Sequence, residues 1–145
     1  MNNYTMYNAN NVLQQLEKLI YDGRTVIIRD VCDELSIFDW WLETLPISKM
    51  KQMQSFLKNA IRLGFTGYVC FKVGASGCAN GMWAHKEPST NGHSPDGDVL
   101  YRSFTPDYTY WSAKINGDWI PDDNDKTYDL CKTVKELEKL LKEVI

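Results

Sequence analysis

The sequence lacks a long hydrophobic run. No window approaches the roughly 18 uncharged apolar residues that a membrane-spanning helix requires. The first residues, MNNYTMYNANN, contain neither a basic start nor an apolar centre, so they do not resemble a secretory signal. These absences argue against insertion into a membrane and lead us to expect a cytoplasmic protein.

Positive charge is also scarce. The chain has 16 Lys and Arg residues against 19 Asp and Glu residues, which gives a formal net charge of -3. Binding to nucleic acid or to anionic lipid depends on net or clustered positive charge. The composition therefore argues against double-stranded DNA as a partner.

Close pairs of cysteines are absent as well. The four cysteines are Cys32, Cys70, Cys78 and Cys131. A domain of this size can fold without disulfides, so we expect reduced thiols. Zinc sites combine closely spaced pairs of Cys or His. Because neither the cysteines nor His85 and His93 form such pairs, the spacing predicts no metal site, and nothing else in the chain indicates a cofactor.

The residues that are present indicate one globular domain over residues 1–145. The chain is 43% hydrophobic and 24% charged, and it contains no internal repeat or linker. Four stretches carry apolar residues at helical spacing. They run from Asn11 as the cap to Gly23, from Asp30 as the cap to Pro46, from Ser48 to Gly64, and from the capping box Thr133-x-x-Glu136 onward.

Between the last two helical stretches, the period of the apolar residues changes from about 3.6 to 2, which is typical of strands. The predicted strands are Phe65–Val73, Gly81–Lys86, Val99–Phe104, Tyr108–Ile115 and Asp118–Ile120, besides the short β-branched segment Thr25–Arg29. Asn116-Gly117 predicts a type I′ hairpin, because both residues tolerate a positive φ. We therefore expect an α+β fold, in which an antiparallel sheet of about five strands carries the N-terminal helices and one C-terminal helix mainly on one face.

The stretch VGASGCANGMWAHKE, residues 73–87, contains a candidate catalytic pair. Cys78 lies in a glycine-rich loop, and His85 on the next strand could act as its base in a hydrolase or acyl transferase. A strand and not a helix follows the loop, so activation by a helix N-terminus is missing. The pattern favours a structural turn, and the enzyme remains the alternative.

A second alternative comes from residues 26–45, which read VIIRDVCDELSIFDWWLETL. Their small and apolar residues resemble the helix-turn-helix pattern of small transcription regulators, which implies a DNA-binding regulator. Ser36 stands at the turn position where glycine is usual, and the second helix contains Asp39 and Glu43 but no Lys or Arg. Phosphates would repel such a helix, so a protein partner suits it better than DNA.

Aromatic residues are abundant, with five Trp, eight Tyr and five Phe. A domain of this size cannot bury so many rings, and Trp and Tyr are the residues that anchor interfaces and stack on nucleobases. The strand alternation places rings on both faces of the sheet, so one aromatic row points away from the helices. The candidate ligand-binding residues are Trp83, His85, Tyr101, Arg102, Tyr110, Trp111 and Lys114, together with the loop residues Ser76, Asn80, Asn91 and His93.

The sequence thus favours a small binding protein over an enzyme. Its aromatic sheet face and the loops between residues 74 and 98 would bind a partner protein or a nucleotide-like molecule. Small domains of this kind occur as accessory proteins of phages and mobile elements, including inhibitors of host defence, and that is our most specific hypothesis. The sequence leaves the formation of homo-oligomers open.

Overall fold

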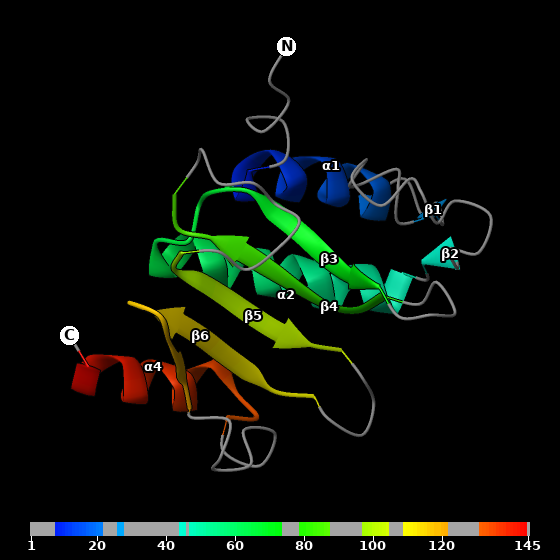
Figure 1. Ribbon diagram of the computed structural model, residues 1–145. Coiled ribbons are helices and arrows are strands. Elements are labelled where there is room, and N and C mark those ends of the chain that lie inside the picture. The colour runs from blue at the N-terminus through cyan, green and yellow to red at the C-terminus, as the bar shows by residue number, and fades with distance from the viewer. Residues whose placement is uncertain are drawn as a thin grey trace.

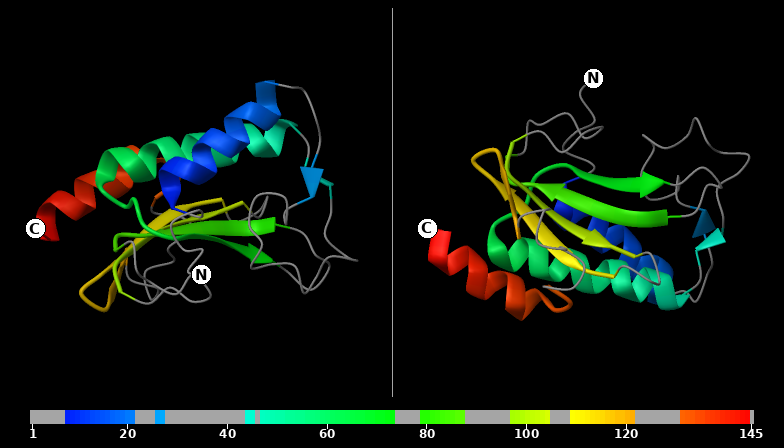
Figure 2. Two further views of the ribbon diagram at one scale, coloured as in Figure 1. Left: turned by 90° about the horizontal axis from the view of Figure 1, so that it is seen from above. Right: turned by 60° about the horizontal axis from the view of Figure 1, so that its bottom comes forward.

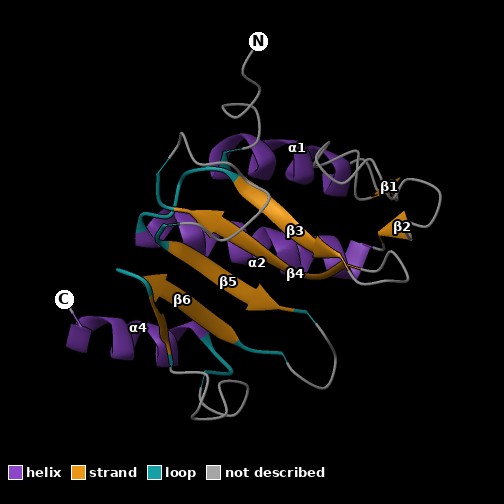
Figure 3. Ribbon diagram, viewed as in Figure 1, coloured by secondary structure: helices purple, strands orange, loops and turns teal. Residues whose placement is uncertain are grey.

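A five-stranded antiparallel sheet organises this chain (Figure 1). The computed structural model describes residues 8–21, 26–27, 44–45, 47–73, 79–87, 97–104, 109–121 and 131–144. The strands are β3 (Val69–Val73), β4 (Ala79–His85), β5 (Val99–Ser103), β6 (Trp111–Ile115) and β7 (Asp118–Ile120). Each strand pairs with the next strand along the chain, which makes the sheet a simple meander (Figure 3).

Three helices cover one face of this sheet: α1 (Ala9–Tyr21), α2 (Ile47–Leu63) and α4 (Val134–Val144). The view from above shows all three on the same side of the strands (Figure 2). The expected α+β fold, with N-terminal helices and one C-terminal helix on an antiparallel sheet, is confirmed. We call the covered side of the sheet the helix face and the opposite side the far face.

The first helix begins earlier than predicted. Asn8 is its N-cap, because Asn8 Oδ1 accepts a hydrogen bond of 2.9 Å from the backbone N–H of Asn11. Asn11 itself lies within the helix. The backbone N–H of Ala9 donates to Gly67 O at 3.1 Å, so the start of α1 is joined to the segment that leads into β3.

Helix α2 ends in a Schellman motif at Gly64. Gly64 has a φ of 93°, and its N–H donates to Ile61 O, while the N–H of Phe65 donates to Ala60 O. Phe65 therefore belongs to the cap of the helix. This explains why β3 begins at Val69 and not at Phe65, as its apolar pattern had suggested.

The capping box predicted for the last helix is confirmed in part: Thr133 is the N-cap, but the Glu136 carboxylate bonds to the Thr133 hydroxyl and not to its backbone N–H. Thr133 Oγ1 accepts a hydrogen bond from Glu136 N at 3.3 Å and donates to Glu136 Oε1 at 3.1 Å. Asn116 and Gly117 both have a positive φ, 53° and 89°, and join β6 to β7 as the predicted two-residue hairpin.

The helix predicted to run from Asp30 to Pro46 is wrong at its end. Thr44–Leu45 form strand β2, which pairs antiparallel with β1 (Val26–Ile27). Both ends of the proposed helix-turn-helix segment are thus extended, and its residues 28–43 lie outside the described residues. Short stretches of β-branched and apolar residues can form a helix or a strand. Here the hydrogen bonding between the two strands prevails over the helical spacing of the apolar residues.

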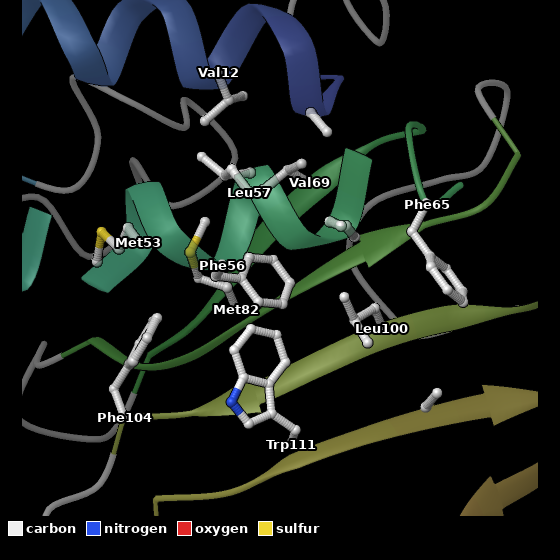
Figure 4. Packing of buried hydrophobic residues seen from close by; sticks show 14 of the residues in the cluster. Val12, Met53, Phe56, Leu57, Phe65, Val69, Met82, Leu100, Phe104 and Trp111 are labelled. Carbon is white, nitrogen blue, oxygen red and sulfur yellow. The ribbon is translucent and has the colours of Figure 1, made fainter. Parts of the chain in front are cut away.

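The core fills the space between the helices and the helix face (Figure 4). The sheet contributes Val69, Met82, Ala84, Leu100, Trp111 and Ala113, and the helices contribute Val12, Leu16, Met50, Met53, Phe56, Leu57, Ala60, Leu137 and Leu141. Burying an apolar side chain of the size of Leu or Met stabilises a fold by roughly 1.5–3 kcal/mol. This layer therefore supplies most of the packing energy and fixes which strand residues point away from it.

Candidate binding surface on the far face

The strand register defines which side chains share the far face. Alternate residues of a strand point to opposite faces, and direct cross-strand partners point to the same face. One row across the sheet consists of Cys70, Trp83, Tyr101 and Ser112, and a second consists of His85, Val99, Lys114 and Trp119. Large rings and polar groups are therefore mixed on this face, whereas the helix face is mostly apolar.

Four aromatic residues form a cluster on the far face, which we call the Tyr101 cluster: Trp83, Tyr101, Tyr110 and Trp119. The ring centroid of Tyr101 lies 6.5 Å from that of Trp83, 5.9 Å from that of Tyr110 and 6.5 Å from that of Trp119. The rings are inclined to one another, from 40° to 81°. Such tilted and edge-to-face pairs are the favoured packing of aromatic side chains.

Gly81 makes room for the central ring. A Cβ at this position would lie 2.6 Å from Tyr101 Oη and 2.9 Å from Tyr101 Cε1. The phenol therefore lies across the glycine, close to Ser103, with which its side chain forms a hydrogen bond. The lack of a side chain at Gly81 is what allows the ring to lie flat on the sheet.

Burial and the neighbouring Tyr110 raise the pKa of Tyr101 to about 12, although the hydrogen bond with Ser103 opposes this shift. The phenol is therefore neutral at physiological pH and acts as a buried hydrogen-bonding group.

The exposure of the cluster increases from its centre to its rim. Tyr101 is 8% exposed, whereas Trp83, Tyr110 and Trp119 are half-buried. Lys114, the direct cross-strand partner of Trp119, is also half-buried. The far face thus presents three partly exposed rings and the ammonium group of Lys114 around a buried phenol.

The sequence prediction included Trp83, Tyr101, Tyr110 and Lys114 but missed Trp119. The hairpin at Asn116-Gly117 fixes the register, so that Trp119 lies opposite Lys114. Lys114 occupies the same face as Ser112 and Tyr110 by alternation. Counting residues from the predicted turn would have placed Trp119 in the cluster.

His85 lies on the far face but is completely buried. Its Nδ1 lies 2.8 Å from Tyr68 O, and because a carbonyl only accepts, Nδ1 carries the proton and donates. The backbone N–H of His85 donates to the same carbonyl at 2.9 Å. His85 is therefore fixed within the protein, and its burial removes it from the residues that a ligand at the surface can touch.

Of the predicted catalytic pair, the structure describes His85 but not Cys78. Cys78 lies outside the described residues, so its distance from His85 is undefined and the enzyme remains a hypothesis from the sequence. The predicted loop contacts Ser76, Asn91 and His93 also lie outside the described residues. Asn80 lies in β4.

Arg102 and Trp111 are not part of the far face. They are direct cross-strand partners on the helix face, where Trp111 is 4% exposed and stacks on Phe56 with a centroid distance of 5.7 Å. The sequence prediction grouped both with Trp83 and Tyr101, but odd and even positions of β5 point to opposite sides. Trp111 is a core residue, and Arg102 belongs to a separate environment beside it.

The described residues include no group of three or more His, Cys, Asp or Glu side chains arranged to hold a metal ion. None of the helices in the described part of the chain is long and apolar enough to cross a membrane. Comparisons of the chain with protein-family models, with curated proteins and with solved structures found no match.

Proposed function

We propose that this chain is a small binding protein whose Tyr101 cluster contacts a partner protein. The observation that carries the proposal is the position of three half-buried aromatic side chains, Trp83, Tyr110 and Trp119, on the face that none of the described helices covers (Figure 2). Trp and Tyr are the residues most enriched among those that dominate binding energy at protein interfaces. A buried centre with a partly exposed aromatic rim is suited to lose its remaining water against an apolar surface.

Two features favour a protein partner over a nucleotide-like ligand. Tyr101 is tilted against each of its three neighbours, so these pairs offer no parallel faces between which a nucleobase would stack. Among the side chains described in the two rows, Lys114 is the one ammonium group, and His85 is buried, which leaves little to hold a phosphate. The net charge of -3 also steers the protein toward basic rather than anionic partners.

A narrower hypothesis is that the chain is an accessory protein of a phage or mobile element. Its partner would then be a protein of the host's defence system, which it inhibits. This hypothesis rests on the size and composition of the chain. The binding surface proposed above is compatible with it and does not depend on it.

The experiment compares Trp83→Ala and Trp119→Ala with the wild-type chain and with Tyr21→Ala. Tyr21 is 90% exposed and lies in α1, outside the Tyr101 cluster, so it controls for the loss of an exposed ring elsewhere. A partner is identified by affinity capture and mass spectrometry, and then purified for calorimetric titration. We expect each cluster variant to weaken the Kd at least about tenfold, which equals 1.4 kcal/mol, and Tyr21→Ala to leave it unchanged.

Equal affinity of all four proteins for every purified partner would contradict the proposal. Titration with nucleotides, followed by the fluorescence of Trp83 and Trp119, tests the other ligand class. Saturable quenching that both alanine variants lose, without a protein partner, would replace our proposal with a nucleotide-binding function. Concentration-dependent sedimentation of the wild-type chain and Trp119→Ala tests whether the partner is a second copy of this chain.

A further inference from the structure

Arg102 occupies an unusual position on the helix face. Its cross-strand partner is Trp111, and Phe104 follows two residues later on the same face. The guanidinium carbon lies over both rings, 5.1 Å from the ring centroid of Trp111 and 5.4 Å from that of Phe104. Figure 4 shows these two rings beside each other at one end of the core. The rings hold the flat guanidinium in place through cation–π contacts.

Within the described part of the chain, Arg102 lacks the acceptors that an arginine in such a setting normally has. Nε is buried and has no hydrogen-bond partner, and no carboxylate of the described part of the chain forms an ion pair with Arg102. Arg62 shows the ordinary arrangement, because its guanidinium donates to the carboxylate of Glu138 and to Asn59 Oδ1. Burial lowers the pKa of Arg102.

The two rings contact the guanidinium through their faces and offer its N–H groups no oxygen acceptor. These N–H groups point outward within the plane of the guanidinium and require oxygen acceptors. Because Nε is buried while the residue as a whole is half-buried, we infer that solvent reaches Arg102 at its two terminal nitrogens. A planar cation held in this way presents two parallel donors to the outside, which is the geometry that carboxylate and phosphate oxygens match.

We propose that Arg102 is an anchor for an oxyanion, which binds end-on to the two terminal nitrogens while Trp111 and Phe104 hold the guanidinium. The ligand group is a carboxylate or a phosphate, and the two have the same recognition chemistry. The site lies on the opposite side of the sheet from the Tyr101 cluster. It is therefore independent of the partner-binding surface, and either proposal can fail alone.

The test is a titration of the full chain with sodium phosphate and, separately, with sodium acetate, at an ionic strength held constant with chloride. Nitrogen-15 NMR follows the indole N–H of Trp111 and the side-chain N–H of Arg102. We expect saturable shifts of both signals that Arg102→Gln removes and that Arg102→Lys weakens at least about tenfold, because lysine keeps the charge but loses the paired donors. Arg62→Gln is the matched control and should leave the Trp111 response unchanged.

The two anions distinguish the sources of the ligand group. A tighter response to phosphate assigns the site to phosphate-bearing ligands, and an equal or tighter response to acetate assigns it to carboxylates such as Asp or Glu of a protein. Shifts that do not saturate beyond the chloride control, or that persist in Arg102→Gln, would overturn the proposal.

Thermal unfolding separates anion binding from a structural role. We expect phosphate or acetate to raise the Tm of the wild-type chain but not that of Arg102→Met, because a ligand stabilises only the state that binds it. In chloride buffer without phosphate or acetate, Arg102→Met should unfold at the same temperature as the wild type or a higher one, since methionine keeps the packing and removes the unpaired donor. A lower Tm of Arg102→Met, combined with no effect of either anion on the wild type, would show that Arg102 serves packing alone.

Discussion

The two faces of the central sheet are built from alternate residues of the same strands, yet they differ in chemistry. The helix face is almost uniformly apolar, with rows such as Val69, Ala84, Leu100 and Ala113. The far face mixes the rings of the Tyr101 cluster with Ser103, Ser112 and His85, all three of which are buried. The comparison shows that the role of an aromatic side chain in a strand depends on the face of the sheet to which it points. On the helix face it fills the core, and on the far face it lines a surface.

Tryptophans on the two faces should respond very differently to truncation. Trp111→Ala removes a ring that stacks on Phe56 and supports Arg102, and it leaves a cavity under α2, so we expect a loss of about 3–5 kcal/mol in the free energy of unfolding. Trp83→Ala removes a half-buried ring of the Tyr101 cluster, and the expected loss is about 1–2 kcal/mol. Urea denaturation followed by far-ultraviolet circular dichroism measures both.

Trp111→Phe and Trp83→Phe are the matched controls, because each keeps an aromatic ring and should recover at least half of its loss. Equal losses for the two alanine variants would mean that the far face contributes to stability as much as the core does. In that case, the Tyr101 cluster would be a second core and its use as a binding surface would lose its support.

Gly81→Ala alters the far face without removing any side chain of the helix face. The new Cβ would meet Tyr101 Oη at 2.6 Å and the backbone oxygen of Arg102 at 2.8 Å, so the ring must move and the strands must separate slightly. We expect a loss of about 1–3 kcal/mol, together with a changed near-ultraviolet circular dichroism spectrum from the displaced rings. Gly117→Ala strains the backbone at a φ of 89° and meets no neighbouring atom, so it should lower stability without changing that spectrum. An unchanged spectrum for Gly81→Ala would contradict the described position of Tyr101.

The order and type of most elements in the described part followed from local signals. The Thr133 capping box, the Asn116-Gly117 turn and the change of period after Gly64 each depend on a few neighbouring residues, which is why the sequence predicts them. The pairing of Val26–Ile27 with Thr44–Leu45 is not local, since a segment of 16 residues outside the described ones separates the two strands. No pattern within either pair could have indicated the other.

The candidate site could be predicted in part. Alternation assigns Trp83, Tyr101 and Tyr110 to one face, and the same rule, applied strictly, separates Arg102 and Trp111 from them. The burial of His85 could not be predicted, because it depends on the carbonyl of Tyr68, seventeen positions earlier in the chain. The lack of an acceptor for Arg102 Nε was equally hidden, since the sequence does not show which acids remain distant.

The buried phenol of Tyr101 on the far face should make the stability of the protein depend on pH in the alkaline range. The folded state raises the pKa of this phenol from 10.0 to about 12, mainly through burial. A raised pKa means that its contribution to stability is fully present below pH 10, where both states are protonated. The contribution is then lost between pH 10 and about 12, because the unfolded chain ionises first.

Tyr101→Phe removes this ionisation together with the hydrogen bond with Ser103. At pH 7, the variant should lose about 1 kcal/mol, the usual contribution of one hydrogen bond. From pH 10 upward, the wild type should lose stability faster than the variant, so the difference in their free energies of unfolding shrinks and then reverses. Urea unfolding at a series of pH values measures this difference. Tyr21→Phe, at an exposed position on α1, should show no such crossing. Parallel pH curves for the wild type and Tyr101→Phe would mean that water reaches the phenol freely, and the Tyr101 cluster would then have an open centre in place of the buried one on which the binding proposal depends.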